Sequence, residues 1–495
     1  MGLVITKRKQ WREKAKLWML KVALENPPSR RLIHSLVQED GGGRLRIEQF
    51  LESYSAGDTK VSGLGARSVL RPVRLAGNAL GVPEPELRRA LSYPSIRRTV
   101  VNMALTLDSI GLRIPQRFYA PLMVVWNLTY RCNLRCRHCY ENAGPLRAGL
   151  GTGNELTLDE KLETVEQIAA SHIPTISFSG GEPLIHPDFW PVAQRARDLG
   201  IYYSIASNGT LITKDVALRL KDAGCSYAGV SVDSPSPQEH DWFRGQEGAW
   251  QKAVDGLRNL VAADIPAVLA FTITRRNHRQ LPEIFRLGED LGVTKVMVYN
   301  FVPTGRGREM IAEDLTPEMR EDALQLMYEY SVAGKSVCTT APQLGRVCKE
   351  HHRPDLVPLA HTGTEASGRD LDVIADLVGG CGVGRAYCAL QPDGRITPCV
   401  YMPDLTIGNV RESSILDVWG DSSLLESLAD RSDLKGACGR CEHRAVCGGC
   451  RARAYAYFGD LKGPDPGCIN NAEAFYEACA GEEPAVALAH SNTGA

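Results

Sequence analysis

The sequence predicts an α/β fold. A partial (β/α)6 barrel (121–330) is expected between an α-helical N-terminal domain (1–120) and a small cysteine-rich C-terminal domain (381–470). Three observations predict it: helical patterns with glycine and proline breaks come first, apolar runs then alternate with amphipathic helices, and cysteines cluster toward the end. Residues 331–380 are expected to be a connecting segment, and residues 471–495 a tail with a disordered end.

Composition narrows the possible functions. The 495 residues are 43% hydrophobic and 23% charged, with a net charge of −1, so no nucleic-acid partner is expected. Fifteen clustered cysteines indicate metal ligation in a reducing compartment, which predicts a cytoplasmic protein. Residues 1–24 are basic and amphipathic, without the uncharged core of a signal peptide or spanning helix. This helix either packs on its own protein or gives the chain a peripheral membrane contact.

The middle of the chain reads as a series of βα units. Thr157-Leu158-Asp159-Glu160 is a capping box that opens the first helix of this region. Functional residues are expected at the C-terminal ends of the strands, as in other parallel barrels. The six expected strands are 122–128, 175–178, 202–206, 227–232, 267–273 and 295–301.

Three cysteines follow the first expected strand in a Cys-x3-Cys-x2-Cys pattern, Cys132, Cys136 and Cys139. Such a loop can close around one face of a [4Fe–4S] cube. A cube has four irons, so three thiolates leave one iron open to a small molecule, much as a catalytic zinc keeps an open position. A three-cysteine zinc site or a purely structural site is the alternative.

With Tyr140 directly after the third cysteine, this loop resembles that of the radical S-adenosylmethionine (radical SAM) superfamily. The resemblance implies that the open iron holds SAM, and that one electron splits SAM into methionine and a 5′-deoxyadenosyl radical. It also implies an external one-electron reductant of the ferredoxin or flavodoxin type.

Polar motifs at the later strand ends extend the resemblance. A double glycine lets the backbone approach a ligand closely, and Glu182 can meet an ammonium group; the run resembles the family motif beside the methionine amino group. Hydroxyl, amide and carboxylate groups at the third and fourth strand ends suit a ribose diol and the methionine carboxylate, and an arginine matches a family position near that carboxylate. The expected cofactor-binding residues are Gly180, Gly181, Glu182, Pro183, Ser207, Asn208, Ser231, Asp233 and Arg244. Ordinary turns and caps are the alternative for each.

The C-terminal cysteines resemble the SPASM extension of radical SAM enzymes, although this chain has Cys447-x2-Cys450 where the usual signature has Cys-x3-Cys. By that resemblance two auxiliary [4Fe–4S] clusters are expected. The first would use Cys381, Cys388, Cys399 and Cys450, and the second Cys438, Cys441, Cys447 and Cys468. Paired Cys-x2-Cys units also bind zinc, which is the alternative for this half of the chain.

The expected function is therefore that of a radical SAM oxidoreductase. The adenosyl radical would abstract hydrogen from a substrate carbon, and an auxiliary cluster would move the second electron. The cysteine motif of residues 447–468 resembles that of enzymes of alternative haem and haem d1 synthesis. This resemblance favours oxidative modification of a tetrapyrrole side chain. Maturation of a ribosomally made peptide and modification of a membrane lipid are alternatives, as is a non-catalytic iron–sulfur electron carrier. Spacing singles out no general acid or base among Tyr140, His138 and Tyr299.

Overall fold

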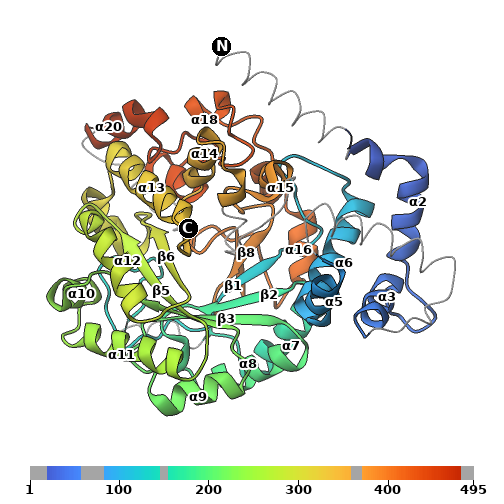
Figure 1. Cartoon of the computed structure of the whole chain (residues 1–495), viewed down its shortest axis with the longest axis horizontal. Coiled ribbons are helices and arrows are strands. Elements are labelled where there is room, and N and C mark those ends of the chain that lie inside the picture. The colour runs from blue at the N-terminus through green and yellow to red at the C-terminus, as the bar shows by residue number, and fades with distance from the viewer. Residues whose placement is uncertain (1–18, 20, 57–82, 145–153, 358–370, 481–495) are drawn as a thin grey trace, which may run out of the picture.

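A computed structural model describes residues 19, 21–56, 83–144, 154–357 and 371–480. Most of the expected amphipathic helix in residues 1–24 and the end of the expected tail lie outside these residues. Within the described residues, strands form a single curved sheet that helices surround on the outside (Figure 1). The α/β fold predicted from the sequence is confirmed. No helix in the described part of the chain is both long and apolar enough to cross a membrane.

The sheet has ten strands in the order β10-β9-β8-β1-β2-β3-β4-β5-β6-β7. Strands β1 to β7 are parallel to their neighbours, as the βα pattern predicts. The first six are β1 (Met123–Asn127), β2 (Thr175–Ser179), β3 (Tyr202–Ser207), β4 (Tyr227–Ser231), β5 (Ala267–Ile273) and β6 (Lys295–Asn300). They coincide with the six expected strands to within two residues at each end.

Outer helices connect these strands. The capping box at α7 is confirmed: Glu160 N donates to Thr157 Oγ1 at 3.3 Å, and Thr157 N donates to Glu160 Oε2 at 2.7 Å. The helices of this region are α7 (Leu158–Ala170), α8 (Phe189–Asp198), α9 (Lys214–Asp222), α10 (Pro237–Arg244), α11 (Ala249–Ala262), α12 (Leu281–Asp290) and α13 (Pro317–Val332). Their buried apolar faces cover the outside of the sheet and form the main core with it.

The segment expected to be a connection, 331–380, contains regular structure. Strand β7 (Val337–Thr339) pairs with β6 and extends the sheet at one edge. Helices α14 (Gln343–Glu350) and α15 (Leu371–Val378) follow in the same segment.

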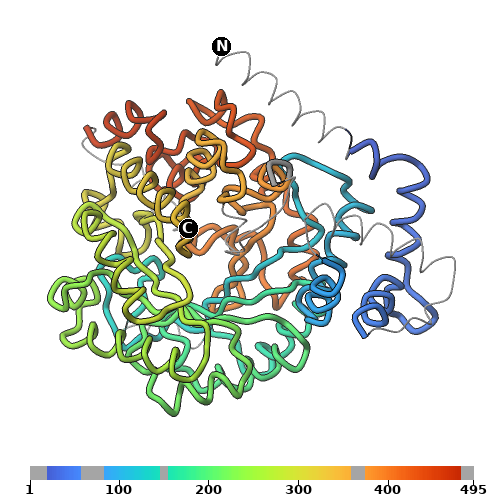
Figure 2. The backbone as a smooth tube through the Cα atoms, viewed as in Figure 1, coloured from blue at the N-terminus to red at the C-terminus, as the bar shows by residue number. Residues whose placement is uncertain are grey.

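The C-terminal region extends the other edge. Strand β8 (Tyr387–Leu390) pairs with β1 in parallel, with Met123 opposite Tyr387, and β9 (Arg395–Thr397) and β10 (Gly408–Asn409) continue antiparallel. The orange C-terminal part of the tube accordingly lies beside the cyan first strand (Figure 2). The remaining C-terminal helices are α16 (Ile415–Asp421), α17 (Ser423–Ala429), α18 (Gly436–Arg440), α19 (Arg451–Phe458) and α20 (Ala472–Ala480). A sheet shared by barrel and cysteine-rich region holds their cysteines in fixed relation.

The N-terminal region is helical, as predicted, with α2 (Pro27–Leu36), α3 (Arg46–Ser55), α5 (Glu84–Ser92) and α6 (Pro94–Ser109). It has a small core of its own that includes Phe50, Leu51 and Leu91. Helix α6 attaches it to the barrel, because Arg98 Nη2 donates to the Leu199 carbonyl at 2.7 Å and Asn102 Nδ2 donates to the His172 carbonyl at 3.5 Å.

Candidate active site

The loop that carries the first three cysteines follows β1 and is held by the segments that follow β2, β4 and β6. Gly181 N donates to the Thr129 carbonyl at 2.7 Å, Arg137 N to the Phe243 carbonyl at 2.9 Å, and Arg306 N to the Cys139 carbonyl at 3.0 Å. Backbone hydrogen bonds of this kind fix the loop without using its side chains. The three thiols are therefore positioned by segments spread over the barrel.

Close backbone contact explains the glycine at position 181. A Cβ atom there would lie 1.9 Å from the Arg131 carbonyl oxygen, on the cysteine loop itself. The sequence suggested that the double glycine lets the backbone approach a ligand. The structure shows that the close approach of Gly181 is to the backbone of the cysteine loop, although Gly180 and Gly181 both also line the cavity described next.

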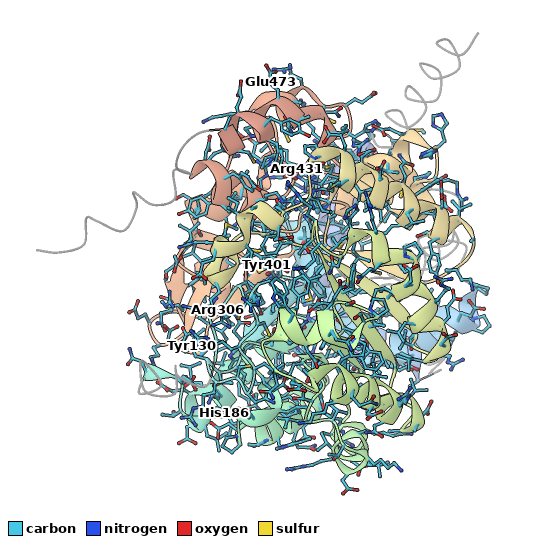
Figure 3. The ribbon with its side chains drawn as sticks, turned by 90° about the vertical axis from the view of Figure 1, so that its left-hand side faces the viewer. Tyr130, His186, Arg306, Tyr401, Arg431 and Glu473 are labelled. Atoms are coloured by element: carbon cyan, nitrogen blue, oxygen red, sulfur yellow. The ribbon has the colours of Figure 1, made fainter. Side chains whose placement is uncertain are left out.

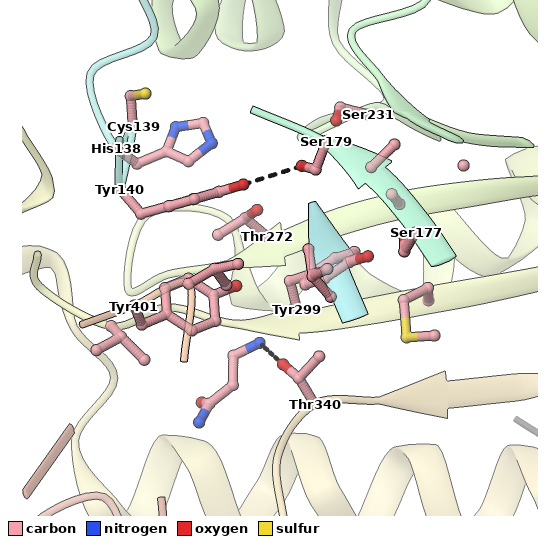
Figure 4. A pocket seen from close by; sticks show the side chains of 18 of the residues that line it. His138, Cys139, Tyr140, Ser177, Ser179, Ser231, Thr272, Tyr299, Thr340 and Tyr401 are labelled. Atoms are coloured by element: carbon pink, nitrogen blue, oxygen red, sulfur yellow. Dashed lines mark hydrogen bonds between the residues drawn. The ribbon is translucent and has the colours of Figure 1, made fainter. Parts of the chain in front are cut away.

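A cavity of about 260 Å³ lies between the cysteine loop and the C-terminal region. Hydroxyl-bearing residues at the ends of β2, β4 and β5 face it, together with Tyr140, Tyr299 and Tyr401 (Figure 4). The Tyr140 hydroxyl lies 2.9 Å from Ser179 Oγ. The lining of the cavity includes Cys132, Cys136 and Cys139 as well as Cys381, Cys399 and Cys450. Cysteines that are more than 240 positions apart in the sequence thus share one cavity.

Six of the nine expected cofactor-binding residues line this cavity, namely Gly180, Gly181, Ser207, Asn208, Ser231 and Arg244. The other three, Glu182, Pro183 and Asp233, are not among its lining residues. Glu182 is fully buried and accepts hydrogen bonds from Ser207 Oγ at 2.9 Å and Asn208 N at 2.8 Å. Burial raises the pKa of its carboxyl to about 7, against the effect of these hydrogen bonds. Glu182 therefore holds two lining residues in place.

Asp233 also acts behind the lining. Its Oδ2 lies 2.6 Å from Arg244 Nη2, and its Oδ1 accepts from Thr272 N at 3.0 Å. Burial alone would raise the pKa of Asp233, but Arg244 and His138 hold it below its usual value. The sequence analysis grouped this carboxylate with the polar residues that suit a ribose diol and the methionine carboxylate. The structure places it in a buried ion pair that orients Arg244, whose Nη1 donates to Cys136 Sγ at 3.6 Å.

Arg306, in the segment that follows β6, also lines this cavity. In the structure its Nε donates to the Cys136 carbonyl at 2.9 Å and its Nη1 to Asn142 Oδ1 at 3.1 Å, while its Nη2 is buried without a hydrogen-bond partner. Arg306 and Tyr401, both labelled in Figure 3, line the same cavity. Only the fold shows that Arg306 Nη2 is buried at the cavity without a partner.

Of the first expected auxiliary set, the structure brings Cys381, Cys399 and Cys450 together but not Cys388. Neighbouring side chains of a strand point to opposite faces of the sheet. Tyr387 lines the cavity, so the next residue of β8, Cys388, faces the main core with only 1% of its surface exposed. Strand alternation therefore turns the Cys388 thiol away from the cavity that the other three cysteines of the expected set line.

The second expected set is brought together completely. Cys438, Cys441, Cys447 and Cys468 line one small separate cavity with Arg346 and Asn471. Several N–H groups point at these sulfurs: Asn471 Nδ2 lies 3.3 Å and Asp465 N 3.4 Å from Cys438 Sγ, and Gly449 N lies 3.4 Å from Cys447 Sγ. Hydrogen bonds of this kind stabilise anionic sulfur ligands.

The residues present fit iron–sulfur clusters and a polar cofactor. Within the described ranges, no three histidine, cysteine or acidic side chains are grouped closely enough for a single metal ion; the cysteines instead surround cavities. Burial raises the pKa of the Cys132 thiol to about 12, so a metal cation is needed to make a thiolate there. Four of the residues that line the cavity each have a buried nitrogen without a hydrogen-bond partner, and these nitrogens can pair with a polar ligand. The four residues are His138, Arg244, Asn300 and Arg306.

Fold and site together define an enzyme built around a three-cysteine iron–sulfur loop, with further cysteine groups beside it. A model of the Radical SAM superfamily matches residues 126–288, and a model of an iron–sulfur cluster-binding domain, SPASM, matches residues 381–442. The chain is 35% identical over 352 residues to AdoMet-dependent heme synthase of Methanosarcina barkeri, which covers 71% of this chain and 97% of that protein. The chain therefore belongs to the radical SAM superfamily and carries a SPASM domain.

Two other relatives show the range of this family. The chain is 31% identical over 307 residues to the mycofactocin maturase MftC of Mycobacterium tuberculosis, which covers 61% of this chain and 71% of that protein. The fold is similar to that of SuiB of Streptococcus suis, with a TM-score of 0.58 at 17% identity over 86% of this chain and 92% of that one. The cofactors implied by the two domains are a [4Fe–4S] cluster, SAM and auxiliary iron–sulfur clusters, and the substrate is a small molecule or a peptide.

Proposed function

We propose that this SAM-dependent oxidoreductase modifies a side chain of a tetrapyrrole during cofactor biosynthesis. One observation carries the proposal: a single cavity is lined by the three-cysteine loop and by auxiliary cysteines, in a chain similar to a heme synthase along nearly all of that protein's length. A substrate in this cavity would lie between the site where a radical forms and a site that can accept an electron.

In this proposal Cys132, Cys136 and Cys139 hold the SAM-binding cluster. When bound, the cluster supplies the electron that splits SAM into methionine and a 5′-deoxyadenosyl radical, which takes a hydrogen atom from a substrate carbon. Gly180, Gly181, Ser207, Asn208, Ser231 and Arg244 would contact SAM, because they line the cavity beside the loop. Glu182, Pro183 and Asp233 would support them from behind.

The chain's own contribution is to bind, orient and exclude water. The buried Asp233–Arg244 pair keeps one cation at the cysteine loop, where the methionine carboxylate of SAM would lie. Burial raises the pKa of the Tyr140 hydroxyl well above its usual value, so it remains protonated and can donate a hydrogen bond at the cavity. No lining residue is given the role of acid or base.

Two features of the lining favour a tetrapyrrole. Tyr299, Tyr387 and Tyr401 present aromatic surface to the cavity, which suits a flat conjugated ring. The unpartnered Nη2 of Arg306 can donate to a carboxylate of a propionate side chain.

Two further parts of the proposal concern partners. An external one-electron reductant of the ferredoxin or flavodoxin type would deliver the first electron, and an auxiliary cluster would supply a site that accepts the second electron from the substrate. A peripheral membrane contact through residues 1–24 stays a prediction, since all but five of these residues lie outside the described part of the chain.

The experiment is anaerobic incubation of reconstituted protein with SAM, a chemical reductant and an iron porphyrin that carries propionates, followed by mass spectrometry of porphyrin and nucleoside. We expect 5′-deoxyadenosine and an oxidised or decarboxylated porphyrin in equal amounts, and neither product after replacement of the three loop cysteines by alanine. Nucleoside formation without any change in the porphyrin would contradict the tetrapyrrole assignment.

Maturation of a peptide is the second candidate, because the chain is similar to a mycofactocin maturase over 71% of that protein. A short precursor peptide in the same assay separates the two candidates. A modified peptide, together with an unchanged porphyrin, would favour peptide maturation over tetrapyrrole modification.

A further inference from the structure

The auxiliary cysteines next to the cavity differ from the set that the sequence suggested. Strand β8 runs beside β1 with Tyr387 opposite Met123 and Cys388 opposite Val124. Tyr387 and Met123 line the cavity, whereas Cys388 and Val124 belong to the main core with 1% and 0% of their surface exposed. A one-residue change of register would be needed to turn Cys388 inward, and that would turn the whole strand over.

The electrostatic surroundings of the thiols agree with this separation. Burial raises the pKa of Cys399 to about 12, and the neighbouring Cys381 and Cys450 contribute to its environment. Burial also raises the pKa of Cys388 to about 12, but no other ionisable group contributes there. The charges of Cys381 and Cys450 therefore reach the Cys399 thiol, which lines the cavity with them.

The described residues that line the cavity offer no obvious replacement for Cys388. They include no aspartate or glutamate, and their one histidine, His138, lies in the first cysteine loop. The Tyr387 hydroxyl donates to Cys399 Sγ at 3.6 Å and accepts from Val400 N at 2.9 Å, so it is already engaged.

We propose that Cys381, Cys399 and Cys450 bind the cavity-side auxiliary cluster with three thiolates, and that its fourth iron takes an oxygen donor of the substrate, such as a carboxylate, from the cavity. Cys388 is a core residue and not a ligand. The proposal rests on the proposed function only in taking the cavity as the substrate site. Its consequence is that this cluster can bind substrate as well as exchange electrons with it.

The first test measures iron and sulfide per chain in the full-length protein after anaerobic reconstitution. Cys388→Ala is compared with Cys399→Ala, and with Cys225→Ala as a matched control that removes another buried thiol, one whose Sγ donates to the Tyr227 carbonyl at 3.2 Å. We expect the parent ratio for Cys388→Ala and Cys225→Ala, and a loss of about a third for Cys399→Ala, because one cluster of three is removed. A loss of about a third in Cys388→Ala would overturn the proposal. Cys388→Val fills the core and repeats the comparison if the alanine variant does not fold.

The second test asks whether the iron is open. In a variant with Cys132, Cys136 and Cys139 replaced by alanine, mild oxidation with ferricyanide should release an iron that lacks a thiolate, and electron paramagnetic resonance should show an oxidised three-iron cluster. Adding Cys399→Ala to that variant should abolish the signal. Absence of the signal in the first variant would overturn the open position. Neither test depends on SAM cleavage, so their failure is distinguishable from failure of the proposed function.

Discussion

The two auxiliary cysteine groups differ in what surrounds them. Cys381, Cys399 and Cys450 open onto the large cavity that they share with the SAM-binding loop, and a tyrosine hydroxyl donates to one of their sulfurs. The distal group, defined by Cys438, Cys441, Cys447 and Cys468, is complete with four thiols in a small cavity, where backbone and amide N–H groups donate to its sulfurs.

This difference suggests a division of labour. A cluster held by three thiolates beside a ligand cavity could bind a substrate or accept an electron from it, whereas an enclosed cluster held by four thiolates would transfer electrons and stabilise the fold. Asp465 joins the two, because its Oδ2 accepts from Cys450 N at 2.7 Å while its own N donates to Cys438 Sγ at 3.4 Å.

The largest effect is expected at the loop that borders the cavity. Gly181→Ala would place a methyl group 1.9 Å from the Arg131 carbonyl oxygen and displace the first three cysteines. We expect SAM cleavage to fall at least about 100-fold, since misplacement by about 1 Å can cost this much. The variant should also lose about a third of its iron, with both auxiliary groups retained.

The matched control for that prediction is Gly420→Ala in α16, where an added Cβ meets nothing within 4 Å. It should keep parent activity and iron. Parent activity in Gly181→Ala would show that the cysteine loop is not held by this contact.

An intermediate effect is expected from Glu182, which is buried behind the cavity. Burial raises the pKa of the Glu182 carboxyl to about 7, against 4.5 in the unfolded chain. Between pH 4.5 and pH 7 the folded protein therefore binds more protons than the unfolded protein does. The free energy of unfolding should therefore fall by up to about 3 kcal/mol as pH rises from 4.5 to 7, and stay lower above it. Urea unfolding of the metal-free protein at pH 5 and pH 8 measures this.

Glu182→Gln should remove that dependence, while Glu163→Gln on the exposed face of α7 should preserve it. Equal pH dependence in the parent protein and Glu182→Gln would contradict the assignment of the proton to Glu182.

The smallest effect is expected at the distal group. Asn471→Ala removes the amide that donates to Cys438 Sγ at 3.3 Å. Loss of a hydrogen bond to anionic sulfur, at about 1.4 kcal/mol, corresponds to a decrease of about 59 mV in a one-electron reduction potential. Potentiometric titration should show one auxiliary cluster shifted and the others unchanged. A shift of the cavity-side signal would break the comparison between the two groups.

Much of this architecture could be predicted from the sequence. The apolar runs that alternate with amphipathic helices predicted six parallel strands, because strands of a parallel sheet are buried on both faces and therefore consist of apolar runs. The spacing of the first three cysteines predicted the three-cysteine loop, because these cysteines lie within eight residues of one another. The structure shows Ser207, Asn208 and Ser231 in the cavity lining at strand ends, where the sequence predicted them. That these residues bind SAM stays a prediction.

Other features could not be predicted. The buried partners of Asp233 and Glu182 are set by the packing of separate loops, and nothing in their local sequence shows whether a carboxylate faces a ligand or an arginine. The guanidinium of Arg306 could only be placed once β6 and the cysteine loop were seen to meet.

The sequence by itself determined the family, the order of secondary structure and the residues able to bind iron, because periodicity and spacing are local properties of the chain. Only the tertiary structure decided which cysteines share a cavity and that Cys388 faces the main core instead. The physical reason is that a side chain's face depends on the register of β8 against β1, and this pairing joins residues more than 260 positions apart.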